Sequence, residues 1–132
     1  MEPDIFTQII DGKIPCHKVY EDESTFAFMD IHPIQPGMIV VVSKQQIDNL
    51  ENLSADMYLA LWSSVQKISI ALKKSFTTAS RVAVRVEGLE VPHAHAVIYP
   101  FNTSAEYNAP PNNSEINHEE LANQSEKIRS FL

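Results

Sequence analysis

The sequence of 132 residues contains one cysteine, Cys16, and no apolar run long enough to cross a bilayer. A single cysteine excludes an intrachain disulfide, and a membrane-spanning helix needs about 20 consecutive apolar residues. The chain begins with acidic residues and lacks the basic segment and apolar stretch of a secretion signal. These absences predict a cytoplasmic protein that does not enter a membrane.

Positive charge is also scarce in this chain. It has 10 Lys and Arg against 17 Asp and Glu, which gives a formal net charge of −7. Proteins bind a nucleic-acid backbone through a concentrated basic face that displaces counterions. We therefore expect no nucleic-acid partner, whereas a small nucleotide needs only a few local donors and fits this composition.

The composition, 44% hydrophobic and 20% charged residues, is typical of a soluble globular protein. A length of 132 residues suits one compact domain with a sizeable core. No repeat, low-complexity tract or linker marks a second domain. The sequence predicts one domain over residues 1–132, with any site inside one fold or at the seam of a homodimer.

Apolar residues with helical spacing predict three helices. The first covers residues 3–10, with Pro3 and Asp4 in its first turn. The second is long and runs from Ser54, its expected N-cap, to about residue 76. The third is expected over residues 119–131. The polar stretch 101–117, which contains two adjacent prolines, is expected to be irregular.

Five other segments favour β-strands. The first two flank a polar pair and predict a hairpin, and the third is a continuous apolar run typical of a strand covered on both faces. The element order, with short turns between neighbouring strands, predicts an α+β fold with a mainly antiparallel five-stranded sheet and one long and two shorter helices. The expected strands are residues 17–22, 24–30, 38–44, 81–87 and 91–99.

The last strand carries the residues that are most informative about function. Alternate side chains of a strand share a face, so His93, His95 and Val97 project together while the alanines between them face the long helix. Strand geometry places the Cα atoms of the two histidines about 6.6 Å apart. Two such imidazoles can bind a metal, transfer protons, attack an electrophile, or have only a structural role.

The surrounding segment GLEVPHAHAVIYP (88–100) resembles the H-φ-H-φ-H-φ-φ signature of the histidine triad (HIT) family, with its closing proline. The resemblance covers about residues 4–100 and implies a HIT-like fold, a homodimer and a pocket for a nucleotide such as AMP or GMP, without a cofactor. Tyr58 and Trp62 of the long helix are candidates for the dimer seam. Other segments match in order: DIFTQIIDGKIP (4–15), VYEDESTFAFMDIHPIQPG (19–37) and VVVSKQQIDNL (40–50).

Four positions depart from the family pattern. The third histidine is replaced by Val97, which cannot donate a proton or a hydrogen bond. Met38 replaces the histidine that commonly follows Pro-Gly, Leu89 replaces the glutamine after glycine, and Arg85 stands at the position of the usual asparagine. These replacements leave the nucleophilic histidine of the family in place and remove some of the side chains that assist it.

The resemblance implies that His95 attacks the α-phosphorus of a nucleotide and that His93 supports the local hydrogen-bond network. A neutral imidazole is nucleophilic near neutral pH, and a hydrogen bond from its other nitrogen to a backbone carbonyl would fix the required tautomer. Backbone N–H groups around Gly88, Glu90 and Val91 would face the phosphate oxygens. Arg85 would add positive charge if it turns inward; otherwise it is a solvated strand residue.

The resemblance also implies a binding site for the nucleoside. Asp30 corresponds to the acid that accepts hydrogen bonds from both ribose hydroxyls, although a turn residue before Pro33 would look the same. The base would lie in an apolar slot whose residues are equally compatible with ordinary core. The slot residues are Ile31, Phe28, Phe6 and Ile9.

A metal site has little support in the sequence. Cys16 and His17 are adjacent rather than spaced like a ligand pair, and no C-x-x-C occurs. His93 and His95 would need a third ligand such as His32, and none stands at the spacing of a metal site. We therefore predict no metal, and we expect His118, in the last helix, to be exposed.

Two functions fit these residues. The first is a hydrolase or transferase that acts at the α-phosphorus of a nucleotide phosphoramidate, adenylate or dinucleotide through a nucleotidyl-histidine intermediate. The second is a nucleotide-binding module with little or no turnover, which Val97, Met38 and Leu89 suggest.

Overall fold

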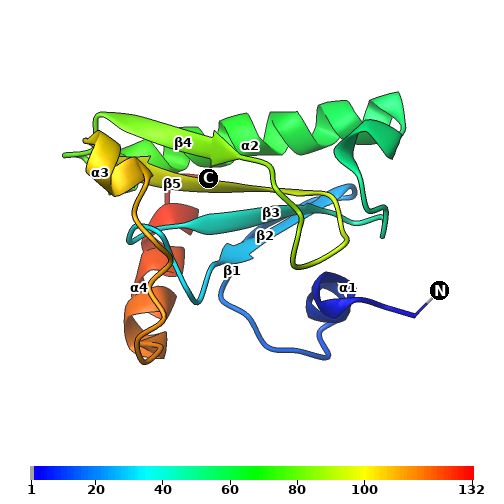
Figure 1. Cartoon of the computed structure of the whole chain (residues 1–132), viewed down its shortest axis with the longest axis horizontal. Helices are drawn as coiled ribbons and strands as arrows, with labels where there is room; N and C mark the ends of the chain where they lie inside the picture. Colours follow the sequence, from blue (N-terminus) through cyan, green and yellow to red (C-terminus); the bar gives the residue numbers. More distant parts are fainter. Residues whose placement is uncertain (1) are drawn as a thin grey trace.

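The computed structural model describes residues 2–132 and has the predicted α+β architecture (Figure 1). Its five-stranded antiparallel sheet has the order β1-β2-β3-β5-β4. Figure 1 shows the long helix on one side of the sheet and the short first helix on the other. The strands are β1 (Lys18–Glu21), β2 (Thr25–Met29), β3 (Ile39–Ser43), β4 (Arg81–Arg85) and β5 (His95–Phe101).

The long helix agrees with the sequence prediction, whereas the helices near the two ends of the chain differ from it. Ser54 caps the long helix as expected, because its hydroxyl accepts a hydrogen bond from the Met57 N–H at 3.2 Å. Asp4 lies just outside the first helix as its N-cap, rather than in its first turn. A short extra helix forms in the stretch expected to be irregular. The helices are α1 (Ile5–Ile10), α2 (Ala55–Ser75), α3 (Ser104–Tyr107) and α4 (His118–Arg129), with a 3-10 turn at Leu50–Asn52.

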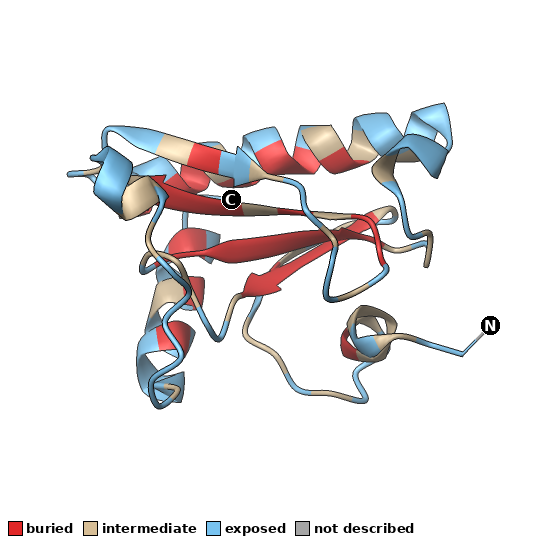
Figure 2. Cartoon of the chain, viewed as in Figure 1, coloured by how far each residue is buried: buried red, intermediate tan, exposed pale blue. Residues whose placement is uncertain are grey.

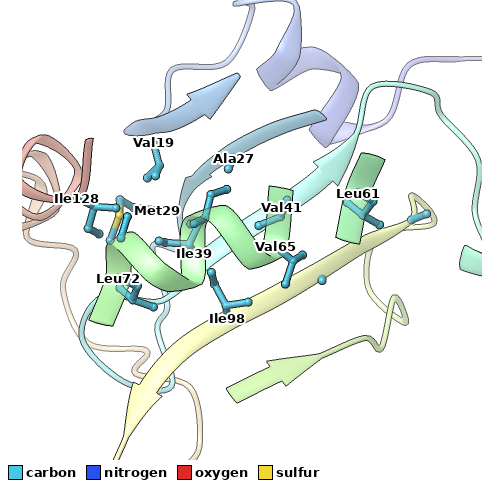
Figure 3. Packing of buried hydrophobic residues seen from close by; sticks show 14 of the residues in the cluster. Val19, Ala27, Met29, Ile39, Val41, Leu61, Val65, Leu72, Ile98 and Ile128 are labelled. Carbon is cyan, nitrogen blue, oxygen red and sulfur yellow. The ribbon is translucent and has the colours of Figure 1, made fainter. Parts of the chain in front are cut away.

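One face of the sheet is sealed by α2 and α4. Ala94, Ala96 and Ile98 pack against the apolar side of α2, as the alternation of the last strand predicts. The central strands β2 and β3 are buried along their whole length (Figure 2), because side chains cover both of their faces. Figure 3 shows the interlocking of Ile39, Val41 and Ile98 with Leu61, Val65 and Leu72.

The turn before β3 depends on a glycine. Gly37 has φ +92°, a left-handed conformation that side chains disfavour. A Cβ atom at this position would also lie 2.6 Å from the ring of Phe76, at the end of α2. Gly37 therefore lets the turn approach the helix closely enough to close this end of the core.

The last strand starts later than predicted. It was expected over residues 91–99, but regular pairing begins at His95 and continues to Phe101. Before it, the His93 N–H donates to the Val91 carbonyl at 2.8 Å, which is a tight turn rather than an extended strand. Pro92 also has no N–H to donate to a ladder. The two histidines therefore straddle the strand start instead of both lying within it.

Among the residues that the structure describes, no helix is both long enough and apolar enough to span a bilayer.

Candidate functional site

The face of the sheet opposite α2 brings both histidines against the first helix. Strand register places Phe28 beside Val40, and His95 beside Val42, so these side chains share this face. From α1, Phe6 contacts both imidazoles edge-on, with ring centroids 5.8 Å from His93 and 4.9 Å from His95.

The expected slot residues fall into two groups. Phe6 packs on Phe28 at 5.7 Å, and Ile9 belongs to the same buried cluster. Ile31 instead lies at the surface, 43% exposed, after the end of β2. The structure thus gathers three of the four residues into one apolar wall beside the histidines and leaves Ile31 outside that cluster.

His93 is fully buried, and both of its ring nitrogens face acceptors. Its Nδ1–H donates to the Asp4 carboxylate at 2.9 Å, and its Nε2–H donates to the Ser43 carbonyl oxygen at 2.5 Å. Because both partners are acceptors, the imidazolium form satisfies both hydrogen bonds. Burial acts to raise the pKa of the Asp4 carboxyl, but hydrogen bonds from the Thr7 N–H and from His93 outweigh it and hold the pKa below its usual value.

His95 is partly buried and has one ring nitrogen engaged. Its Nδ1–H donates to the backbone carbonyl of His93 at 2.6 Å. Within residues 2–132, no hydrogen-bond partner contacts its Nε2. Burial lowers the pKa of His95, against the opposite effect of the hydrogen bond to His93. The result is a neutral imidazole near pH 7 whose Nε2 lone pair is free.

Asp30 follows β2 and faces the same region. One carboxylate oxygen accepts the His32 N–H at 2.8 Å, and within the described part of the chain the other oxygen has no partner. Burial raises the pKa of Asp30. The negative charge of Glu90 acts in the same direction, and the charge of His95 in the opposite one. Asp30 is therefore electrostatically coupled to His95 and to the loop before β5.

A small cavity of about 120 Å³ adjoins the two histidines. Residues 48–51 and 86–88 form its other walls, and Gly88 takes a left-handed turn there with φ +75°. Among residues 2–132, no acceptor contacts the backbone N–H groups of residues 88–91. Val91 is partly buried and Glu90 is exposed. A larger hollow of about 730 Å³ lies between the C-terminal end of α2 and α4, and no histidine lines it.

Arg85 lies in β4, partly buried, and does not turn toward the histidines. It pairs with Val97 across the sheet, so it starts on the face that carries His95. Its guanidinium then donates to the Tyr99 hydroxyl at 3.2 Å and lies 5.3 Å from the Tyr107 ring centroid. The side chain is therefore held on two aromatic residues rather than being fully solvated or hydrogen-bonded to either histidine.

Sequence reasoning missed the role of Asp4. Asp4 and His93 are 89 positions apart, and an acid before a short helix is ordinary N-cap chemistry, so no local pattern indicates the pair. Gln46 was also missed. Its side-chain oxygen accepts hydrogen bonds from the Asp4 N–H at 3.0 Å and from the Thr7 hydroxyl at 2.9 Å.

The remaining candidate metal ligands lie apart from this site. His118 is exposed as expected, and its Nδ1 lies 2.9 Å from Nε2 of His17. His32 is exposed and contacts the carbonyl of Asn112. Across residues 2–132, no three His, Cys, Asp or Glu side chains converge in a way that could hold a metal ion.

Comparison with known proteins identifies the family. The HIT domain model matches residues 11–101. This chain belongs to the HIT family. An uncharacterised HIT-like protein of Methanocaldococcus jannaschii is 36% identical over 99 residues, which cover 73% of this chain and 77% of the relative. The adenylylsulfatase HINT3 of Arabidopsis thaliana is 32% identical over 71 residues, which cover 54% of this chain but only 36% of the plant enzyme.

Solved structures of HIT proteins share the whole fold. A Hit-like protein from Bartonella henselae, solved with an unknown ligand, superposes with a TM-score of 0.84 at 31% identity over 98% of this chain and 96% of its own. A hypothetical histidine triad nucleotide-binding protein from Sulfolobus tokodaii gives a TM-score of 0.78 at 22% identity over 96% of this chain and 89% of its own. At that lower identity the likeness concerns the fold alone.

Proposed function

We propose that this chain binds a purine nucleotide and acts as a hydrolase or transferase at its α-phosphorus, with His95 as the nucleophile. The observation that carries this proposal is the hydrogen bond from His95 Nδ1–H to the His93 carbonyl, which leaves Nε2 free beside a cavity. The family of the chain, with one relative named as an adenylylsulfatase, supports chemistry at phosphorus.

The bound nucleotide would extend from this cavity over the open face of the sheet. A volume of about 120 Å³ suits a phosphate group rather than a whole nucleotide, because pockets for whole ligands have about 300 Å³ or more. The unpartnered N–H groups of residues 88–91, among them those of Gly88, Glu90 and Val91, would donate to the phosphate oxygens. The free carboxylate oxygen of Asp30 would accept from the ribose.

The base would lie against the apolar wall formed by Phe6, Ile9 and Phe28, with Ile31 at its rim. This arrangement fits a flat ring better than a polar group, because the wall offers no hydrogen-bonding side chain of its own. Base preference would then depend on the edge of the ring that remains in solvent.

The reaction has two steps at one phosphorus. Nε2 of His95 forms a bond to phosphorus while the bond to the leaving group breaks, and the leaving group takes a proton. Water, or another acceptor, then attacks the nucleotidyl-histidine, which restores the free imidazole and releases the nucleotide. Val97 has no proton to give, so in this chain the proton for the leaving group would come from solvent.

A nucleotide-binding module without efficient turnover is the second candidate. The observation that favours it is the same Val97, which lies on the face of His95 without any polar atom. His93 cannot replace the missing donor, because both of its ring N–H groups are already engaged by Asp4 and Ser43.

We also propose a homodimer and a cytoplasmic location. Tyr58 and Leu59 of α2 and Val84 of the edge strand β4 are apolar or aromatic and at least 40% exposed, and an open strand edge favours pairing. The indole N–H of Trp62 is buried and has no partner within residues 2–132. A monomeric mass at micromolar concentration would refute the dimer.

Covalent trapping tests the enzyme against the module. Adenosine 5′-phosphoramidate is added, the protein is denatured at alkaline pH to preserve the phosphorus–nitrogen bond, and the intact mass is measured. We expect a nucleotidyl adduct in the native chain and in His118→Ala, which removes an exposed histidine elsewhere. We expect no adduct in His95→Ala. If the native chain binds the nucleotide but forms no adduct, the binding module becomes the better description and the enzyme proposal fails.

A further inference from the structure

We propose that Asp4 is a positioning residue that acts on His95 through His93: its carboxylate holds His93 as a buried imidazolium, and His93 fixes the orientation of His95. The effect on turnover rests on the function proposed above. The protonation of the two rings does not depend on that function, and it can be measured separately.

The first step is the pairing of a buried cation. His93 has no exposed surface, and an unpaired charge at such a position is strongly unfavourable. Both carboxylate oxygens of Asp4 lie within 3.0 Å of its Nδ1, and the opposite nitrogen faces the Ser43 carbonyl. The carboxylate supplies the compensating charge, so its removal would leave a ring that is stable only in its neutral form.

The second step is the anchoring of the carboxylate itself. Asp4 accepts the Thr7 N–H at 2.8 Å as the N-cap of α1, and its own N–H donates to Gln46. Gln46 also accepts from the Thr7 hydroxyl. One side chain from outside α1 therefore holds both Asp4 and Thr7 in place. The carboxylate is thereby held where both of its oxygens face His93 Nδ1.

The third step links His93 to His95. The His93 carbonyl accepts the His95 Nδ1–H, and Phe6 of α1 contacts both rings. A shift of His93 would move the acceptor that selects the tautomer of His95 and would also move the ring that packs on it. Asp4 thus controls the direction of the free Nε2 although it does not touch it.

The charges of Asp4 and His93 also act on the pKa of His95. Burial lowers the pKa of His95, and the nearby His93 charge lowers it further. The charges of Asp30 and Asp4 raise it, in that order of size, and each acts less than His93. If Asp4 loses its charge and His93 its proton, the larger opposing effect disappears and the pKa of His95 rises. The other acids beside this cavity and loop are Asp48, Glu51, Glu87 and Glu90.

The variant Asp4→Asn separates this role from helix capping, because asparagine caps helices as well as aspartate and has nearly the same shape. Asp11→Asn is the matched control, since it removes the same charge at the exposed C-terminal end of α1.

Nitrogen NMR of the histidine rings gives the decisive readout. In the native chain near neutral pH we expect both ring nitrogens of His93 to carry hydrogens and His95 to carry one on Nδ1. In Asp4→Asn we expect His93 to lose one ring hydrogen and the titration of His95 to move to higher pH, whereas Asp11→Asn behaves like the native chain. A native His93 with one unprotonated nitrogen would overturn the proposal, even if the variant failed to fold.

Kinetics provide the second readout. In Asp4→Asn we expect kcat to fall by about ten-fold to a hundred-fold, as misplaced catalytic groups cause. We expect KM to change little, and the acidic limb of the pH profile to move to higher pH. An unchanged kcat and profile would overturn the positioning role. If no protein in the series turns over substrate, the proposed function fails while the NMR result still decides the state of His93.

Discussion

The two faces of the sheet are built on different principles. The face under α2 and α4 joins sixteen buried apolar residues in one cluster, whereas the opposite face has two clusters of five and three. Around those smaller clusters lie His93, His95 and Asp30, whose side-chain polar atoms are partly engaged by backbone groups and by Asp4. Stability therefore depends mainly on the first face, and the second can hold polar groups at a tolerable cost.

Strand β5 contributes to both faces at once. Ala96 and Ile98 point into the cluster under α2, whereas His95 and Val97 point to the face of the site. Substitutions in this strand should therefore fall into two classes. Those at even-numbered positions should affect stability, and those at odd-numbered positions should affect the site. The following predictions test this separation.

The largest effect is expected from a cavity in the sealed face. Ile68 of α2 has no exposed surface, so Ile68→Ala should lower the free energy of unfolding by about 2–5 kcal/mol. Nucleotide affinity of the folded variant should stay unchanged, because the cluster that contains Ile68 includes neither histidine and not Asp30. Urea unfolding and calorimetry measure the two quantities. A loss below about 1 kcal/mol, or a parallel loss of affinity, would contradict the division between the faces.

The opposite pattern is expected for Asp30→Ala. Loss of the ribose acceptor should weaken AMP or GMP binding by about 1–3 kcal/mol, the cost of unmet hydrogen bonds. Since burial raises the pKa of Asp30, the folded state is penalised by its charge near pH 7, and the variant should not be less stable through this effect. Asp11→Ala is the control in calorimetry. Unchanged affinity in Asp30→Ala would place the ribose elsewhere.

Restoring a proton donor at position 97 should raise the rate of hydrolysis by about ten-fold. Val97 is partly buried on the face of His95 and stands two residues after it in β5, about 6.6 Å along the strand. If proton delivery limits turnover, Val97→His should raise the rate of adenosine 5′-phosphoramidate hydrolysis by about ten-fold or more. Val97→Phe, which introduces a ring without a proton to give, controls for packing. No increase would mean that solvent already serves the leaving group well.

The smallest expected effect is the pH dependence of stability. Because burial lowers the pKa of His95 below its usual value of about 6.5, the unfolded chain binds more protons between those two values. The free energy of unfolding should therefore rise with pH across that window and level off above it. Asp30, with its raised pKa, acts with the opposite sign at lower pH. Urea unfolding between about pH 5 and pH 7 should show a weaker rise in His95→Asn than in the native chain.

Much of the fold could be predicted from local patterns. The helical spacing and the cap at Ser54 located α2 to within a residue, and the apolar run located β3, because both signals depend only on neighbouring positions. The start of β5 was placed wrongly because alternation continues through a turn that Pro92 and the His93 N–H bond impose. Helix α3 was missed because its four residues offer no apolar period.

The site was predicted less completely than the fold. The structure brings His93, His95 and Phe6 together, and Asp30 is coupled to His95 by charge. Asp4 could not be found, because its partner is 89 positions away and each residue alone has an ordinary explanation. The position of Arg85 on Tyr99 and Tyr107 likewise depends on contacts of β4 with β5 and with α3.

The parity of β5 also limits how this chain can change in length. Val42 pairs with His95 and Val41 with Ala96, so each position is tied to one face by its partner in β3. A single inserted residue before His95 that slipped the register would turn the imidazole into the aliphatic layer under α2 and expose an alanine in its place. The loop of residues 86–91 pairs with no strand and can absorb insertions without that penalty. An insertion in residues 95–99 should therefore disrupt both faces of the sheet, whereas one in residues 86–91 should change only the proposed phosphate contacts.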